Sequence, residues 1–274
     1  MPQKDEALII LTNDDGIESP GLLAAAHALA PLGWILVAAP SRQQSAMGRS
    51  MPLTNKGTIQ SLKRAIGDDH WEVYAVEGTP AQSVQHAILE LADRQPDLVV
   101  SGINYGENVG TGTTISGTIG AALEAASFEV PALAVSLAMD QQYHVSHSDE
   151  VDFSVSGYFT HHFAERLLKN NMPPDVDVLK VDVPWDATEQ TAWRLTRQSR
   201  QSYYQPQRPE RASFDIPGIV GYQRDIDFDG LEPESDIAVL VNERLVSVTP
   251  LSLDLTSRVT FNELDAQLRG VDPK

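Results

Sequence analysis

Two adjacent carboxylates are the residues in this sequence best suited to chemistry. Asp14 and Asp15 follow a short apolar run and precede Gly16. Carboxylates side by side repel one another and raise each other's pKa, so keeping both ionised requires a cation or strong hydrogen-bond donors. An isolated Asp-Asp-Gly could be only a turn, because Asp and Gly are favoured there for conformational reasons. Because Asn13 adds a polar side chain directly after a predicted strand, we expect a divalent metal site.

Further oxygen donors follow the next two predicted strands of the core. Residues 42–50 and 102–108 both include hydroxyl or amide side chains. In an open parallel sheet, ligands bind beyond the carboxyl ends of the strands, where loops and helix N-termini converge. Oxygen donors of this kind suit Mg²⁺ or Mn²⁺ better than zinc. Of the histidines, His144 could approach such a site from the loop after Ser136.

A glycine-rich segment, residues 102–120, leads into a helix predicted to begin at Ser116, Gly117 and Thr118. A flexible linker has a similar composition, but a helix N-terminus with free N–H groups and flanking hydroxyls is an anion site. The segment matches neither a Walker A loop nor a dinucleotide fingerprint, and no nucleophile elbow marks a serine hydrolase. A metal ion facing an anion-binding helix end suits attack on a phosphate ester.

The elements that must position these residues alternate between strand and helix, as in βαβ units around a parallel sheet. Apolar runs predict strands at residues 7–11, 34–38, 98–101, 132–136, 178–183, 193–196 and 246–249. Helical periodicity predicts helices at residues 20–32, 80–92, about 117–128, 154–169 and 261–268. Ser19 and Thr79 put a hydroxyl at the N-cap, each before a proline at the first helical position. The predicted fold is α/β, with a mostly parallel sheet flanked by helices.

Residues 200–233 break this pattern and predict a protruding hairpin or arm. The stretch is too aromatic for plain disorder and too irregular for a helix. Its apolar side chains would leave an exposed patch of a kind that monomers rarely show, so we expect a second copy of the chain to cover it. These side chains are Tyr203, Tyr204, Phe214, Ile216, Ile219 and Tyr222.

Composition limits the classes of function. The 274 residues suit one large α/β domain, and the lack of cysteine excludes disulfides and thiolate sites. A net charge of −18 disfavours binding to duplex nucleic acid. The longest apolar stretch, residues 113–139, is interrupted by Glu124, Glu129 and Pro131, so no membrane span is expected. We expect a cytoplasmic protein, because the N-terminus does not resemble a signal peptide.

Several ordered motifs of the chain resemble the SurE family of survival-protein 5′-nucleotidases. The resemblance covers about the first 140 residues, with echoes at TRQSR (196–200) and VTPL (248–251). The motifs are LTNDDGI at 11–17, SAMGRS at 45–50, GTPA at 78–81, VSGINYGEN at 100–108 and SGT at 116–118. This resemblance implies a Rossmann-like catalytic core in residues 1–140. Residues 141–274 would complete the core and supply the arm.

The resemblance also implies residue roles. One Mg²⁺ or Mn²⁺ per subunit would be held by Asp14, Asp15, Ser45 and Asn104, with Asp14 as the candidate catalytic residue. The groups on the phosphate side would be Asn13, Asn108, Ser116, Gly117 and Thr118. The expected substrate is a nucleoside 5′-monophosphate, and the expected assembly is a homodimer or homotetramer formed through extensions of the second half.

Other functions stay open from sequence alone. The same site could act on 3′-nucleotides or short polyphosphate, and the chain could instead be a metal-dependent nucleotide-binding regulator without turnover. A phosphatase with an aspartyl nucleophile of the haloacid dehalogenase type fits less well, because Asp14 and Asp15 are consecutive and do not form an Asp-x-Asp pair.

Overall fold

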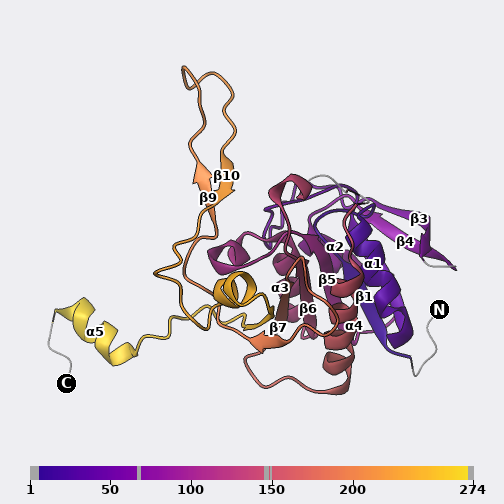
Figure 1. Ribbon diagram of the computed structural model, residues 1–274. Helices are drawn as coiled ribbons and strands as arrows, with labels where there is room; N and C mark the ends of the chain where they lie inside the picture. The colour runs from indigo at the N-terminus through magenta and orange to yellow at the C-terminus, as the bar shows by residue number, and fades with distance from the viewer. Residues whose placement is uncertain (1–5, 67–68, 145–147, 149, 271–274) are drawn as a thin grey trace.

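A nine-stranded β-sheet forms the centre of the computed structural model, which describes residues 6–66, 69–144, 148 and 150–270 (Figure 1). Its strands are β1 (Leu8–Thr12), β2 (Trp34–Pro40), β3 (Ile59–Ile66), β4 (Asp69–Val76), β5 (Leu98–Tyr105), β6 (Ala132–Leu137), β7 (Val178–Val183), β8 (Trp193–Leu195) and β11 (Val246–Leu251). The strand order is β3-β4-β2-β1-β5-β6-β7-β11-β8. All neighbours pair in parallel except β3 with β4 and β7 with β11. The α/β fold with a mostly parallel sheet is thereby confirmed.

Helices cover both faces of the sheet. Helices α1 (Pro20–Leu29) and α4 (Ser154–Lys169) pack together on one face, and α2 (Pro80–His86) and α3 (Gly117–Ser127) pack together on the other. Strand β1 is buried throughout, and its side chains alternate between the two cores. Helix α5 (Phe261–Arg269) stands apart near the C-terminus (Figure 1). In the described part of the chain, no helix is both long and apolar enough to cross a bilayer.

The first two helices begin where the sequence predicts and change geometry before their predicted ends. Helix α1 passes into a 3₁₀ turn (Ala30–Leu32), and α2 passes into a π-helical turn (Ala87–Leu91). Thr79 caps α2 through its side chain, which accepts from the backbone N–H of Gln82 in a full capping box. Ser19 occupies the N-cap position of α1 without a side-chain cap bond. The proline after it is therefore the stronger start signal.

The hairpin of β3 and β4 is absent from the sequence prediction. Its outer strand, β3, is mostly exposed, so it lacks the continuous apolar run that marks the inner strands. Strand β5 is also longer than predicted, because it continues past Ser101 through a bulge to Tyr105. The extension places Asn104 near the carboxyl end of β5, opposite Ser136 of β6, which matters for the site below.

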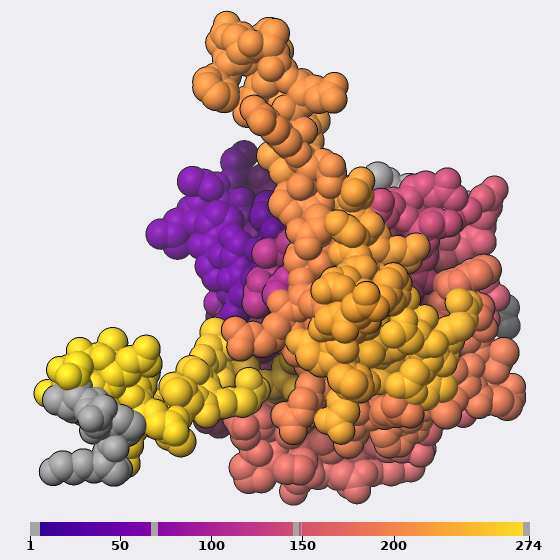
Figure 2. Space-filling model, turned by 60° about the vertical axis from the view of Figure 1, so that its left-hand side comes forward, coloured from indigo at the N-terminus to yellow at the C-terminus, as the bar shows by residue number. Residues whose placement is uncertain are grey.

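A two-stranded antiparallel hairpin of β9 (Tyr204–Gln207) and β10 (Gly221–Arg224) projects from the body (Figures 1 and 2). The predicted protruding hairpin is thus present. The expectation that Tyr203 belongs to an exposed patch is wrong, since it is 3% exposed and packs with Val109 and Ile237 at the root of the arm. Phe214 and Ile219, in the connection between the two strands, are 94% and 90% exposed.

Candidate functional site

A tight turn at the carboxyl end of β1 presents the two aspartates. The side-chain amide of Asn13 donates to the carbonyl of Gly16 and accepts from its N–H, both at 3.1 Å. Gly16 has φ +97°, and a Cβ there would lie 3.0 Å from the carbonyl carbon of Arg42, so the turn requires glycine. Asn13, predicted on the phosphate side, therefore has its amide engaged in shaping this turn.

Asp14 points at the start of α3. Its Oδ1 accepts from the Thr118 hydroxyl at 2.6 Å, and the backbone N–H groups of Gly117 and Thr118 also act on the carboxylate. A Cβ on Gly117 would lie 2.7 Å from Asp14 Cβ and Oδ2, so the helix end and the carboxylate touch. Burial raises the pKa of Asp14, and these donors lower it only in part. The anion at this helix N-terminus is thus a side chain of the protein itself.

Asp15 lies against two other segments. Its Oδ1 accepts from Gln43 Nε2 and its Oδ2 from the backbone N–H of Tyr105, both at 3.2 Å. Burial, followed by the charge of Asp14, raises the pKa of Asp15 well above the usual range of a carboxyl. A cation that approached both side chains would reverse this effect and favour their ionised forms.

The remaining predicted ligands lie on the two neighbouring segments. The N–H of Gln44 donates to the carbonyl oxygen of Asp14 at 2.6 Å, so Ser45 follows directly in an exposed loop beside the turn. Asn104, half-buried after the bulge in β5, donates through Nδ2 to the carbonyl of Gly106 at 2.6 Å. Because Nδ2 makes this bond, the amide oxygen Oδ1 of Asn104 points away from Gly106. The structure therefore brings all three predicted segments to one end of the sheet.

The donor set fits a hard divalent cation. It consists of two carboxylates, a hydroxyl and an amide oxygen, which is the type of set that Mg²⁺ and Mn²⁺ accept while keeping bound waters. Among the described residues, no group of three or more His, Cys, Asp or Glu side chains is arranged to hold a metal. The candidate set named above contains oxygen donors alone, whereas zinc sites usually include histidine or cysteine.

Ser116 and Asn108, two other residues predicted to bind phosphate, make hydrogen bonds within the protein. Ser116 Oγ accepts from the N–H of Ile119 at 3.2 Å and caps α3. Asn108 donates through Nδ2 to Ser136 Oγ at 2.8 Å, and its backbone N–H donates to Asp182 Oδ1 at 2.8 Å. These contacts fix Ser116 at the start of α3, next to Gly117 and Asp14, and fix Asn108 against the ends of β6 and β7.

Behind this loop lies a buried ionic cluster that the sequence prediction missed. Lys180 Nζ donates to Asp182 at 2.6 Å and to Asp236 at 3.1 Å, and all three residues are fully buried. Asp236 also accepts from the N–H of Gly110 at 3.0 Å, so the cluster holds the loop between β5 and α3. The available signal was a lysine and an aspartate within the buried strand β7.

Charge pairing decides the protonation of this cluster. Burial works against the ammonium of Lys180, but Asp182 and Asp236 outweigh it and raise its pKa. Burial also raises the pKa of Asp182 to about 6, although the nearby Lys180 opposes the shift. The lysine is therefore the stable charge at the centre of the cluster.

His144 does approach the site from the loop after β6, as predicted. A Cβ on Gly106 would lie 2.6 Å from His144 Nε2, and the carbonyl of His144 accepts from Gln43 Nε2 at 2.8 Å. Its ring stacks on Tyr222 and meets Tyr204 edge-on. Burial lowers the pKa of His144 and favours the neutral ring.

Gln43 and Glu107 are site neighbours that the sequence did not single out. Gln43 bridges Asp15 and His144 through one nitrogen. Glu107 accepts from the Tyr204 hydroxyl at 2.6 Å and from the N–H of Met139 at 3.2 Å, which ties the arm to the site loop. Both residues lie inside or beside the motifs quoted above, but their long-range partners are not visible in local sequence.

The chain is similar to known proteins of one family over nearly its whole length. Residues 9–205 match the family model described as survival protein SurE. A protein named 5′-nucleotidase SurE from Thermococcus kodakarensis is 40% identical over 258 residues, 93% of this chain and 96% of its own. One of the same name from Thermococcus gammatolerans is 43% identical over 267 residues, 96% of each chain. The crystal structure of the SurE protein from Aquifex aeolicus superposes with a TM-score of 0.72 at 28% identity, covering 96% of this chain and 99% of that one.

Proposed function

The chain belongs to the survival protein SurE family, and we propose on this basis that it is a metal-dependent 5′-nucleotidase. It hydrolyses nucleoside 5′-monophosphates to nucleoside and phosphate. The observation that carries the proposal is the convergence of Asp14, Asp15 and the N-terminus of α3 at one end of the sheet. The relatives quoted above carry the name of this activity over nearly the whole chain length.

Asp14, Asp15, Ser45 and Asn104 are the ligands in this proposal. One bound Mg²⁺ or Mn²⁺ would neutralise phosphoryl oxygens and acidify a water. The hydrogen bonds from Thr118, Gln43 and the Tyr105 N–H hold the two carboxylates in place for the ion. Asp14 is also the candidate acceptor of the water's proton, because its carboxylate would lie next to a water held by the ion.

The groups on the phosphate side are Asn13, Asn108, Ser116, Gly117 and Thr118. Backbone N–H groups at the start of α3 suit an anion, and in the described structure they act on Asp14. With a cation held by Asp14, these N–H groups would also be available as donors to phosphoryl oxygens. Asn13 and Asn108 act by holding the turn and the loop in position.

Phosphate release tests the proposal directly. We expect release from nucleoside 5′-monophosphates with Mg²⁺ or Mn²⁺, and loss of at least 95% of it after chelation. Ser45→Ala should raise the metal concentration needed for half activity, whereas the exposed Ser257→Ala should not. Full activity in a chelated, metal-free preparation would reject the metal mechanism. A panel that includes 3′-nucleotides and tripolyphosphate decides the breadth of the substrate range, and tight nucleotide binding without release would indicate a regulator.

The arm belongs to a separate part of this proposal, the assembly of a homodimer or homotetramer. Its exposed apolar residues Phe214, Ile219 and Val220 give a second copy a surface to cover. Light scattering of a chain with residues 208–220 replaced by a short turn should show a smaller particle than the parent. A parent that is monomeric at micromolar concentration would contradict the assembly. A cytoplasmic location, where nucleoside monophosphates are formed, completes the proposal, and cell fractionation tests it.

A further inference from the structure

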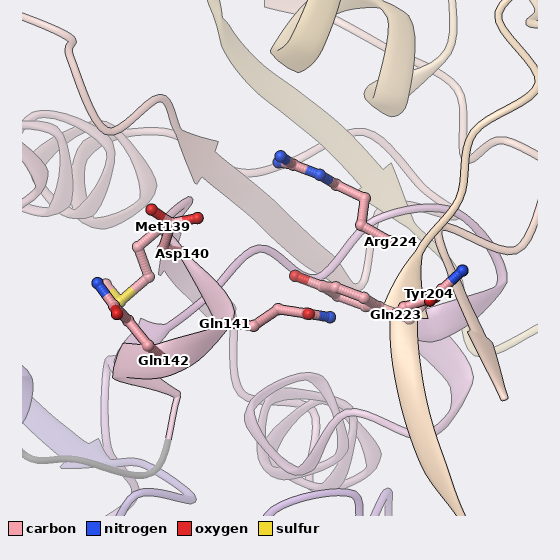
Figure 3. Close-up of a pocket in the computed structure, with 7 residues that line it drawn as sticks. All are labelled: Met139, Asp140, Gln141, Gln142, Tyr204, Gln223 and Arg224. Atoms are coloured by element: carbon pink, nitrogen blue, oxygen red, sulfur yellow. The ribbon is translucent and has the colours of Figure 1, made fainter. Parts of the chain in front are cut away.

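A polar pocket opens where the arm meets the body of the protein (Figure 3). Its volume is about 510 Å³, a size that accommodates small organic ligands. Asp140, Gln141 and Gln142, in the segment after β6, form one wall. Tyr204 of β9 and Gln223 of β10 form the opposite wall. The pocket is therefore formed where the base of the projecting arm faces a segment distant in sequence.

Two sets of contacts place this pocket beside the carboxylate site. Gln43 Nε2 donates both to Asp15 Oδ1, at 3.2 Å, and to the carbonyl of His144, at 2.8 Å. His144 follows Gln142 of the pocket wall by two residues and lies against Gly106. The side-chain amide of Gln43 thus connects Asp15 to the segment that continues from the pocket wall.

Glu107 provides the second connection. Its two carboxylate oxygens accept from the Tyr204 hydroxyl and from the N–H of Met139, one from each wall of the pocket. Glu107 follows the candidate ligand Asn104 by three residues. The pocket and the metal-binding segment are therefore fixed relative to one another through hydrogen bonds to one side chain.

The lining has the chemistry of a surface that binds a nucleoside. Three glutamine amides each offer a donor and an acceptor, which is the arrangement that pairs with the edge of a nucleobase. Asp140 can accept from sugar hydroxyls, and Tyr204 adds aromatic surface to the opposite wall. Gln141 Nε2 is buried and has no hydrogen-bond partner among the described residues, so a ligand acceptor there would satisfy it.

We propose that this pocket binds the base and sugar of the substrate while the phosphate lies at the carboxylate site. This inference rests on the proposed nucleotidase function. An inorganic polyphosphate fits the pocket less well, because Asp140 would repel it and the glutamines are neutral. Arg224 is the one cation among the seven described residues of the lining, and it lies beside Tyr203, with Nη1 at 3.4 Å from the hydroxyl oxygen.

Substrate selectivity tests the pocket. We compare kcat/KM for adenosine 5′-monophosphate, ribose 5-phosphate and 4-nitrophenyl phosphate in the full-length parent and in Gln141→Ala and Gln223→Ala. We expect the ratio of nucleotide to 4-nitrophenyl phosphate to fall about tenfold in each variant, mainly through KM. Gln207→Ala, an exposed glutamine of the neighbouring strand β9 outside the pocket, is the matched control and should keep the parental ratio.

The outcomes separate the pocket from the proposed function. An equal loss on all three substrates would show a structural effect and overturn the pocket, and an unchanged ratio would overturn it as well. Calorimetric binding of adenosine 5′-monophosphate gives a readout that needs no turnover, and we expect both variants to bind about tenfold more weakly. A parent that binds the nucleotide in this way without hydrolysing it would contradict the nucleotidase function and leave the pocket supported.

Discussion

Two pairs of buried aspartates lie at the same end of the sheet, and the contacts that stabilise them differ. Asp182 and Asp236 share the ammonium of Lys180, a cation that is part of the chain. The donors described at Asp14 and Asp15 are a hydroxyl, an amide and backbone N–H groups, and the pKa of both carboxyls stays raised. The charge of the first pair is balanced by a lysine side chain, whereas the second pair has the properties of a site whose charge is balanced by a bound ion.

The difference also separates structural from chemical roles. In the lysine cluster, Asp182 accepts a hydrogen bond from the N–H of Asn108, and Asp236 accepts one from the N–H of Gly110. These bonds fix the loop between β5 and α3. A permanent cation suits that task because it cannot dissociate. A divalent ion can also bind phosphate oxygens and water, which a buried ammonium with two carboxylate partners cannot do. The predictions below test whether the two pairs really divide the work in this way.

The largest expected effect is on turnover in Asp15→Asn. Removing one negative charge should weaken the binding of the divalent cation. It should also lower kcat/KM at saturating metal by about a thousandfold, which corresponds to roughly 4 kcal/mol in activation free energy. Steady-state phosphate release and calorimetric metal titration measure the two effects. Asp93→Asn, on an exposed aspartate, is the control and should remain near the parent. A folded Asp15→Asn protein with parental activity would remove the distinction between the two pairs.

Lys180→Met tests the other pair. The variant leaves Asp182 and Asp236 buried without their cation, which should lower the free energy of unfolding by about 3–5 kcal/mol. Urea denaturation gives the value. Lys169→Met, which breaks only an exposed helical ion pair with Glu165, should change it by less than about 0.5 kcal/mol. Similar losses in both variants would mean that the buried cluster has no special role.

Thr118→Val sharpens the comparison at Asp14. The change keeps the side-chain shape and removes the 2.6 Å hydrogen bond to Oδ1, a bond to a charged group that contributes about 1.5–3 kcal/mol. We expect a ten- to hundredfold loss in kcat/KM and an acidic limb of the pH profile that moves to higher pH. Thr114→Val, on an exposed threonine bonded to the Thr111 carbonyl, is the control. An unchanged profile would show that Thr118 does not tune Asp14.

The smallest expected effect is a pH dependence of stability in the metal-free protein. Asp182 has a raised pKa of about 6 in the folded chain against 3.8, so the folded state binds more protons between these values. Stability from this group is present below pH 4 and is lost as the pH rises through 6. The raised pKa values of Asp14 and Asp15 act in the same direction.

Urea denaturation in chelator at pH 4.5 and 7.5 measures this loss of stability, to which Asp182 alone should contribute about 2 kcal/mol, since one pKa unit corresponds to about 1.4 kcal/mol. Added Mg²⁺ or Mn²⁺ should restore stability at pH 7.5 in the parent and much less in Asp15→Asn. Equal stability at both pH values without metal would contradict the raised pKa values.

Sequence reasoning works here where the signal is local. Strand ends and helix starts follow from runs of apolar residues and from prolines after hydroxyls, so the turn at Asp14 and the start of α3 are placed correctly. The family motifs further predict that the segments after β1, β2 and β5 and the start of α3 form one site. The outer hairpin of β3 and β4 is missed because its outer strand is mostly exposed and resembles a polar loop in sequence.

Long-range partners are the part that local patterns cannot supply. Asp236 lies 56 residues from Lys180, and Tyr204 lies 97 residues from Glu107. Nothing in either segment alone specifies the other. The buried position of Tyr203 has the same cause, since an aromatic in a polar stretch looks exposed until the core residues that receive it are known.

The contact between Gly117 and Asp14 has a consequence for how this chain can evolve. Any side chain at position 117 would meet Asp14 atoms at 2.7 Å, and room could be made only by moving or shortening that residue. Position 14 is itself a proposed ligand, so the compensating change would sacrifice the metal. Single substitutions at position 14 or 117 should therefore almost always lose activity. A library of random substitutions selected for activity should retain both Asp14 and Gly117.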